Sequence, residues 1–333
     1  MTSRTGSSVP AAGTAATATA RAVGTAVTVG VGMAMAVQAR INGELARRID
    51  DGLVAALLSF LGGLVLLVLL AAALPQLRAG LRRVRAALAD RRLRPYQLLG
   101  GVFGAFLVTC QGLTVAAIGV AVFTVAVVSG QAASSLLVDR AGLGPGGPQP
   151  VTVPRIVGAA LALAAVMLAM SDRLDAPRAL WLVLLPALAG VGIAWQQAVN
   201  GRVGAAARRG GHPLAGMLPA ALVNFVVGTL ALVLVTAVEV AIRGLPDPLP
   251  AQPWLYLGGP LGVLFIGTAA AIVPITGVLL LGLGTVAGQL VGALLLDLFV
   301  PAGAGHLTAT TLIGTALTLV AVTVIALPGR PRA

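Results

Sequence analysis

The sequence predicts an all-α polytopic membrane protein with ten transmembrane helices, arranged as two inverted repeats of five helices each. Of its 333 residues, 58% are apolar and only 10% are charged, whereas about a quarter of the residues of a soluble domain are charged. Mean hydropathy is +1.00, and apolar runs of the roughly 20 residues that a transmembrane helix needs recur along the chain. Features of the first half also recur in the second half.

Apolar windows bounded by charged residues or by Gly and Pro clusters predict the individual spans. The stretches 96–138 and 254–296 contain no charge, and each is long enough for two spans joined by a tight turn. Residues 1–20 are mostly Ala, Thr, Ser and Gly, which predicts a disordered N-terminal tail. The predicted spans are 22–41, 53–74, 96–116, 120–138, 151–171, 179–199, 214–238, 254–273, 276–296 and 308–327.

Matched motifs predict an internal repeat, with halves at 21–175 and 176–333. Five spans per half is an odd number, so the second half would enter the membrane from the opposite side, as inverted repeats do. The matched positions include Gln38 with Gln196, Asn42 with Asn200, Gly119 with Gly277, Gln131 with Gln289, and Asp139 with Asp297.

Arginine placement predicts the orientation in the membrane. All 22 basic residues are arginines, and nearly all of them lie between apolar runs, where they act as topology signals. With a cytoplasmic N-terminus, most of them fall on the inner side. We therefore expect a multi-pass protein of the cytoplasmic (inner) membrane with both termini in the cytoplasm. The arginines left on the outer side are Arg40, Arg47, Arg48, Arg173, Arg178 and Arg243.

The Arg-rich loop 75–95 has two interpretations that both place it in the cytoplasm. It is either a topology signal or an anchor to anionic lipid headgroups, which attract basic clusters beside a span. A nucleic-acid partner is not expected, because the loop has no aromatic residues among its arginines on which bases could stack. Membrane lipids are therefore the expected binding partner of this loop.

Several segments resemble a bacterial family known by its YdcZ member, within the drug/metabolite transporter superfamily. The first half carries QARINGEL at 38–45, LSFLGG at 58–63, LGGVFG at 99–104, VSGQ at 128–131 and LVDRAG at 137–142. The second half carries QAVNG at 197–201, NF at 224–225, LGG at 257–259, AGQ at 287–289 and LLD at 295–297.

The resemblance implies a fused tandem copy of one five-span unit and an inner-membrane exporter that works by alternating access. It also implies a shared cavity built from the first four spans of each half. It supplies no substrate. The second half departs from the pattern after Asp297, where no residue matches Gly142, which puts in doubt a common role for Asp139 and Asp297.

Polar side chains inside the spans are the candidate substrate pathway, because spanning helices satisfy their own backbones. Gln38 and Asn42, like Gln196 and Asn200, are four residues apart and therefore share one helical face. A facing pair of amides can hydrogen-bond a substrate. In the inverted topology the two pairs lie at opposite mouths, and we predict that they alternate as gates. Alternatively, the Asn-Gly sequences that include Asn42 and Asn200 only end their helices.

The remaining pathway candidates carry alternative interpretations. Gln131 and Gln289 each follow a glycine, so they either line the cavity or belong to close helix packing. Trp195 either covers a ligand or anchors at the membrane interface. Positions that differ between the halves are where an asymmetric substrate could be recognised; they are Gln111, matched by Ala269, and Ser59, matched by Asn224.

Charged residues give little sign of coupling or catalysis. No Asp, Glu, Lys or His lies at the centre of a predicted span, which disfavours proton coupling through a central carboxylate. Asp139 and Asp297 lie at predicted helix ends, either as solvated charges or as a peripheral coupling site. No His, Cys or carboxylate spacing resembles a nucleophile or metal site, so we predict no catalytic residue, no metal and no cofactor.

The sequence thus predicts a transporter that moves a small-molecule metabolite through a weakly polar cavity, by facilitated diffusion or exchange. A monomer could suffice, because a fused repeat supplies both halves of the cavity. The alternatives are a lipid or lipid-carrier flippase and a non-transporting membrane scaffold. A central pocket would favour the metabolite transporter, a lateral slot the flippase, and a closed dry centre the scaffold.

Overall fold

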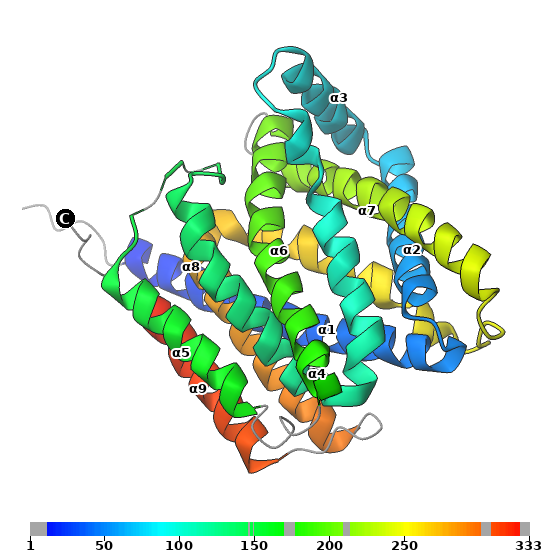
Figure 1. Cartoon of the computed structure of the whole chain (residues 1–333). Coiled ribbons are helices and arrows are strands. Elements are labelled where there is room, and N and C mark those ends of the chain that lie inside the picture. Colours follow the sequence, from blue (N-terminus) through cyan, green and yellow to red (C-terminus); the bar gives the residue numbers. More distant parts are fainter. Residues whose placement is uncertain are drawn as a thin grey trace, which may run out of the picture.

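The computed structural model describes residues 12–145, 147–148, 150–169, 177–208, 214–300 and 308–326. Within these residues the chain forms nine α-helices and two short 3-10 turns, without a β-strand (Figure 1). The predicted all-helical class is confirmed. The helices are α1 Ala12–Ile49, α2 Gly52–Ala73, α3 Pro75–Ala89, α4 Gly100–Arg140, α5 Val153–Ala169, α6 Pro177–Ala207, α7 Leu214–Arg243, α8 Gly258–Phe299 and α9 Ala309–Ala326, and the turns are η1 Pro95–Leu98 and η3 Pro253–Tyr256.

Length and composition identify four clear membrane spans among the described residues. They are Gly52–Ala73, Pro95–Arg140, Trp181–Ala207 and Leu218–Arg243. The second of these contains 46 residues, about twice what one crossing needs. Shorter apolar helices occur at Val153–Ala165, Gly284–Phe299 and Ala309–Val324. These helices fit a multi-pass membrane protein.

Helix α1 is longer at both ends than the span predicted at 22–41. It begins at Ala12, so residues 12–20 of the predicted N-terminal tail are helical. Alanine has the highest helix propensity of all residues, and five of these nine residues are alanine. Residues 1–11 lie outside the described residues. At its other end α1 continues to Ile49.

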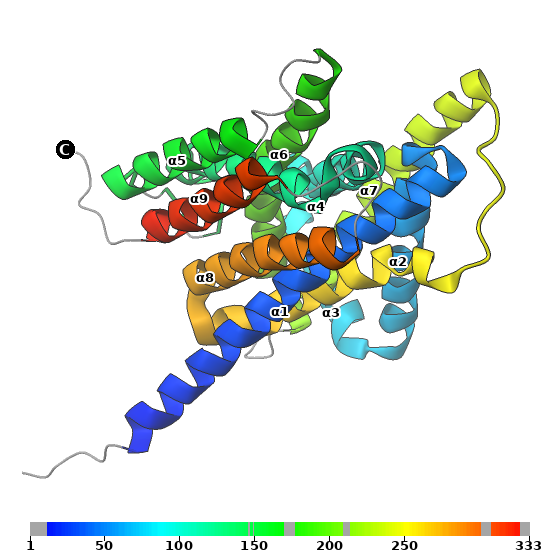
Figure 2. The same ribbon diagram turned by 90° about the horizontal axis from the view of Figure 1, so that it is seen from below.

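Gly119 breaks α4 into two arms. Its backbone has φ 80° and ψ 162°, whereas the residues around it are helical, and the two arms diverge from this point (Figure 1). The tight turn predicted between residues 116 and 120 therefore lies at Gly119. Both views show α8 likewise bent near its middle into two arms (Figures 1 and 2).

The break in α4 is held by Asp297, near the end of α8. Its carboxylate accepts hydrogen bonds from the backbone N–H groups of Val120, at 3.0 Å, and Ala121, at 2.7 Å. These are among the first N–H groups of the second arm, which have no partner within their own helix. A Cβ atom at Gly119 would lie 2.8 Å from Asp297 Oδ2, so only glycine fits there with a positive φ.

The two matched aspartates therefore have different environments. Asp297 is only 6% exposed, so the interpretation of this residue as a solvated helix-end charge is wrong. The reason is that the broken arm of α4 offers it unpaired N–H donors. Asp139 instead forms an ion pair with Arg155, and these side chains are 34% and 26% exposed.

Helices of one half pack on helices of the other half. Helix α1 lies along α8, α4 along α6, and α5 beside α9 (Figures 1 and 2). Two glycines allow the first two contacts: a Cβ atom at Gly288 would lie 2.0 Å from the Val29 carbonyl oxygen, and one at Gly130 would lie 1.9 Å from that of Ala187. Small residues that let backbones touch are typical of membrane helix packing.

The Arg-rich loop predicted at 75–95 contains the amphipathic helix α3. Leu77, Gly80, Val84 and Ala87 are buried against α6 and α7, whereas Arg82 and Arg85 are exposed. Pro75 stands at the first helical position, where its missing N–H costs nothing. The basic loop is thus an ordered helix with one basic face.

We predict that Asp297→Ala destabilises the protein more than Asp139→Ala does. The first change leaves two buried N–H donors without an acceptor, each costing roughly 1–3 kcal/mol, whereas the second removes a partly exposed ion pair worth about 0–1 kcal/mol. Thermal unfolding of both variants in detergent measures the difference. Equal losses of stability would contradict the role of Asp297 in holding the break of α4.

Candidate functional site

The first cluster of buried amides lies where α1 meets α4 and the start of α8. Asn42 Nδ2 donates to Gln111 Oε1 at 2.6 Å, and Gln38 Nε2 donates to the carbonyl oxygen of Gly258 at 2.9 Å. A Cβ atom at Gly258 would lie 2.1 Å from Asn42 Oδ1 and 2.8 Å from Ser59 Oγ. Gln38, Asn42, Ser59 and Gln111 are all buried, and together we call them the first amide cluster.

A second cluster has the corresponding place in the other half. Gln196 Nε2 and Asn200 Nδ2 of α6 both donate to Asn224 Oδ1 of α7, each at 3.0 Å. A Cβ atom at Gly100, at the start of α4, would lie 2.5 Å from Asn200 Oδ1. We call Gln196, Asn200 and Asn224 the second amide cluster. In each cluster an asparagine of one half thus packs on the first glycine of a helix of the other half.

An aromatic pair lies close to both clusters. The rings of Phe60 on α2 and Phe225 on α7 have centroids 5.0 Å apart and planes inclined by 37°. A Cβ atom at Gly104 would lie 3.0 Å from Gln196 Nε2 and 3.4 Å from Phe60 Cζ. At Gly262 the corresponding distances are 2.9 Å to Gln38 Nε2 and 3.4 Å to Phe225 Cζ. Each cluster therefore meets the aromatic pair from its own side.

The amide pairs do not end their helices. Helix α1 continues from Asn42 to Ile49, and α6 continues from Asn200 to Ala207, which is about 10 Å at a rise of 1.5 Å per residue. The alternative in which the Asn-Gly sequences only terminate helices is therefore wrong. Inside a membrane a continued helix keeps its backbone paired. The amide residues therefore lie within their helices and not at the helix ends.

The other predicted pathway residues lie at contacts between helices. Gln131 Nε2 donates to Gln197 Oε1 at 3.1 Å between α4 and α6, and Gln289 Nε2 contacts the Met35 sulfur at 2.9 Å between α8 and α1. Trp195 is half-buried and packs edge-on against Phe103, with centroids 5.2 Å apart. None of these contacts includes a residue of the amide clusters.

Sequence reasoning missed the role of Phe60 and Phe225. The signal was present, since Ser59-Phe60 matches Asn224-Phe225 in the repeat. Two residues that occupy equivalent positions of the repeats and also contact each other must lie at the interface between the two halves. Phe60 and Phe225 therefore lie at this interface, close to both amide clusters.

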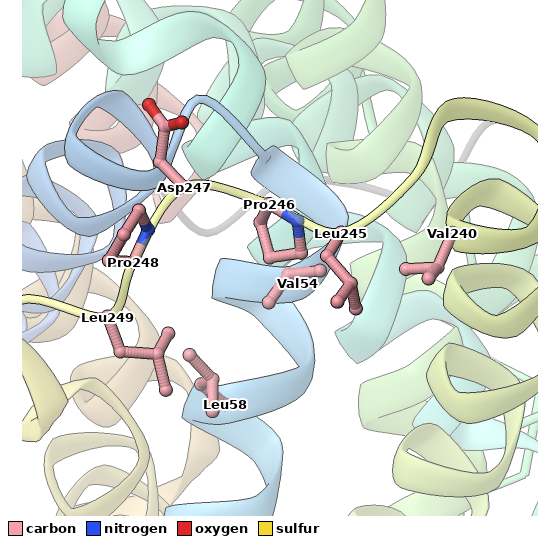
Figure 3. Close-up of a pocket in the computed structure, with 8 residues that line it drawn as sticks. All are labelled: Val54, Leu58, Val240, Leu245, Pro246, Asp247, Pro248 and Leu249. Carbon is pink, nitrogen blue, oxygen red and sulfur yellow. The ribbon is translucent and has the colours of Figure 1, made fainter.

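Two surface hollows of the described residues are lined by none of the residues of the amide clusters. The larger, about 400 Å³, lies between the start of α2 and the end of α7 (Figure 3). Its apolar side chains face one another, whereas the carboxylate of Asp247 points away from them. It is lined by Val54, Leu58, Val240, Leu245, Pro246, Asp247, Pro248 and Leu249. A smaller hollow of about 210 Å³ lies beside α3 and α6 and includes Arg92 and Arg202.

No grouping of three His, Cys, Asp or Glu side chains able to hold a metal ion occurs in the part of the chain that the structure describes. The amide clusters offer amide oxygens, amide N–H groups and hydroxyls. Such groups can exchange hydrogen bonds with a polar ligand.

We predict that Asn224→Ala destabilises the protein by roughly 1–3 kcal/mol, because the buried donor of Gln196 and the partly buried donor of Asn200 lose their shared acceptor. Ser135→Ala is the control, since its Oγ bonds the carbonyl oxygen of Ala132 within its own helix. Thermal unfolding in detergent compares the variants. An Asn224→Ala protein as stable as the Ser135→Ala protein would show that the second cluster contributes no net stability.

Comparison with known proteins gives the family. A family model described as "Putative inner membrane exporter, YdcZ" matches the chain twice, over residues 23–168 and 181–324. No curated protein matches the chain. The two matches fall one in each half and together cover most of the sequence, as expected for a tandem fusion. The chain therefore belongs to the YdcZ family of drug/metabolite transporters, in which it is a fused double copy.

Proposed function

We propose that this protein moves a small metabolite across the inner membrane by alternating access between two inverted five-helix repeats. Membership of an inner-membrane exporter family supports a transporter. The proposal adds the arrangement of the repeats, the location of the pathway and the class of cargo. Both termini are cytoplasmic in this proposal, because that orientation leaves most arginines inside.

Helix geometry supports the count of ten crossings. With two arms each for α4 and α8, and with α3 at the surface, the remaining helices and the four arms supply five crossings for each half. Contacts between the halves are also reciprocal: Gly258 packs on Asn42 as Gly100 packs on Asn200. Reciprocal contacts are what a pseudo-two-fold axis in the membrane plane produces.

The observation that carries the proposal is the pair of largely buried amide clusters that lie close to Phe60 and Phe225. Polar side chains in a membrane interior are costly and mark substrate pathways. Each cluster belongs to one half and packs on the other half, so motion of one half against the other opens one cluster to a substrate. The substrate then replaces the hydrogen bonds that the amides make to one another.

The proposed mode is facilitated diffusion or exchange. The carboxylates that could serve peripheral coupling have protein partners: Asp297 holds the α4 arm, and Asp139 is paired with Arg155. With a cytoplasmic N-terminus, Asp297 lies on the outer side and Asp139 on the inner side. These different partners favour a structural role for Asp297.

A lipid or lipid-carrier flippase is the second candidate. The hollow between α2 and α7 is apolar and open (Figure 3), and an apolar groove of this kind can hold an acyl chain. The amide clusters lie outside this hollow, whereas a flippase needs a polar path for the headgroup beside the groove for the chain. The metabolite transporter therefore accounts for more of the buried polar residues.

We predict that the Asn42→Ala, Asn200→Ala double variant loses transport. Metabolites and lipids are compared between cells and medium for strains that lack the protein, express it, or express the double variant at an equal level. Loss of about two hydrogen bonds at about 1 kcal/mol each corresponds to roughly 30-fold slower transport. A small molecule should therefore shift only in the strain with the unaltered protein.

Gln76→Ala with Gln252→Ala is the matched control, because both of these amides are exposed. A change confined to lipids would favour the flippase. Equal profiles for all strains would favour the non-transporting scaffold, and a double variant that transports normally would remove the amide clusters from the pathway.

A further inference from the structure

Three buried oxygen atoms on one face of α7 have no hydrogen-bond partner. They are Thr229 Oγ1, Thr236 Oγ1 and Glu239 Oε2. Both threonines are only 5% exposed, and spacings of seven and three residues keep all three side chains on one face of the helix. Buried polar atoms are almost always paired, so a row of unpaired ones calls for an explanation.

Other threonines of this chain pair within their own helix. Thr114, Thr315 and Thr318 each donate to the carbonyl oxygen four residues earlier, at 2.7, 2.8 and 2.8 Å. Thr229 and Thr236 lie inside α7, where the same bond is within reach, and they do not make it. Their hydroxyls are therefore free to bind another group.

The row leads from the amide clusters to one end of α7. It starts one helical turn after Phe225 and ends at Glu239, one residue before Val240, which lines the larger surface hollow. Fifteen residues of helix from Asn224 to Glu239 rise about 22 Å, most of the roughly 30 Å hydrocarbon thickness. The row thus runs from the centre of the protein to a mouth.

The fold itself does not require this row. Helix α2 is the counterpart of α7, since Ser59, Phe60 and Gly63 match Asn224, Phe225 and Gly228. The residues of the first half that match Thr229, Thr236 and Glu239 are Leu64, Ala71 and Leu74. The first half therefore carries apolar side chains at these positions, and the polar groups belong to α7 alone.

The unpaired atoms share one chemistry. Among the described residues, all buried side-chain nitrogen and oxygen atoms without a partner are oxygens. Carboxylate and amide oxygens accept hydrogen bonds and cannot donate them, whereas threonine hydroxyls can do either. A ligand that satisfies the amide and carboxylate oxygens must therefore donate, and the threonine hydroxyls accept from the same donor. The atoms are Asn42 Oδ1, Gln196 Oε1, Thr229 Oγ1, Thr236 Oγ1, Glu239 Oε2 and Thr285 Oγ1.

Glu239 adds a preference for positive charge. Its Oε1 accepts a hydrogen bond from Arg243 at 3.2 Å, and Arg243 is 75% exposed whereas Glu239 is 15% exposed. The other carboxylate oxygen is buried and unpaired. A cationic N–H donor makes the strongest hydrogen bond to such an oxygen, whereas an anion would be repelled by the carboxylate of Glu239.

We propose that Thr229, Thr236 and Glu239 form the half of the substrate pathway between the amide clusters and the Arg243 end of α7, and that the transported molecule is a small organic cation with N–H donors. This inference rests on the proposed transport function and names the class of its substrate. Glu239 is the specificity-determining residue, and the threonine hydroxyls continue the row toward Asn224.

Charge movement in proteoliposomes on a solid-supported membrane tests the proposal with three probes. They are n-butylammonium, tetramethylammonium, which has the charge without N–H donors, and butyrate. We expect a current with n-butylammonium alone. Glu239→Gln keeps the shape of the side chain and removes its charge, and should lower this response by roughly 10-fold or more, because hydrogen bonds to charged groups are about twice as strong as neutral ones.

Two matched controls separate the row from general effects of substitution. Glu44→Gln removes a carboxylate whose oxygens are both bonded, by Arg47 and Arg48, and should leave the response unchanged. Thr236→Val should weaken the response, whereas Thr318→Val, which removes a hydroxyl bonded within its own helix, should not. Thermal unfolding of each variant confirms that equal amounts of folded protein are compared.

A Glu239→Gln response equal to that of the unaltered protein, or a current with butyrate, would overturn the inference. If no probe gives a current while the comparison of strains still reveals a transported metabolite, the proposed transport function is supported and the proposed cationic substrate is contradicted. If neither experiment detects transport, the proposed function falls as well.

Discussion

Direct backbone contact between the two halves is the interaction on which the other features depend. Gly32 of α1 touches the Thr285 carbonyl oxygen of α8, and Gly190 of α6 touches that of Val127 of α4; a Cβ atom at either glycine would lie 2.0 Å from it. Dispersion between closely packed helices replaces the hydrophobic driving force that is lacking in lipid. One to two turns further along, these helices present Gln38 and Gln196 beside the aromatic pair.

The two halves share a frame and differ in the chemistry placed on it. Phe60 and Phe225 keep matching places, whereas Ser59 is matched by Asn224, and Asp139 and Asp297 have unlike partners. A fused chain can make such changes in one half at a time, which a symmetric homodimer cannot do. The asymmetry between Ser59 and Asn224 lies within the amide clusters, and a further asymmetry lies along α7, where an asymmetric substrate would meet it.

Composition and repeated motifs were enough to predict the helical class, the repeat and the family, because they depend on many residues at once. Short sequence patterns gave wrong predictions where the local structure depends on residues far away in the sequence. Asn42-Gly43 resembles a helix terminus, yet in lipid a continued helix keeps its backbone paired. Burial of Asp297 depends on a break at Gly119, which lies far away in the sequence. The row on α7 was missed because a threonine in a helix normally bonds its own turn.

The interlocking of the halves also bears on how the protein is made. Helix α1 packs on α8, α4 on α6, and α5 on α9, so the helices synthesised first find their main neighbours only after the second half has been inserted. Until then, their glycine faces and their amides face lipid or the insertion machinery. Assembly of this transporter is therefore a late event in its synthesis, and a chain that stops after the first half lacks the surfaces needed to bury its own polar residues.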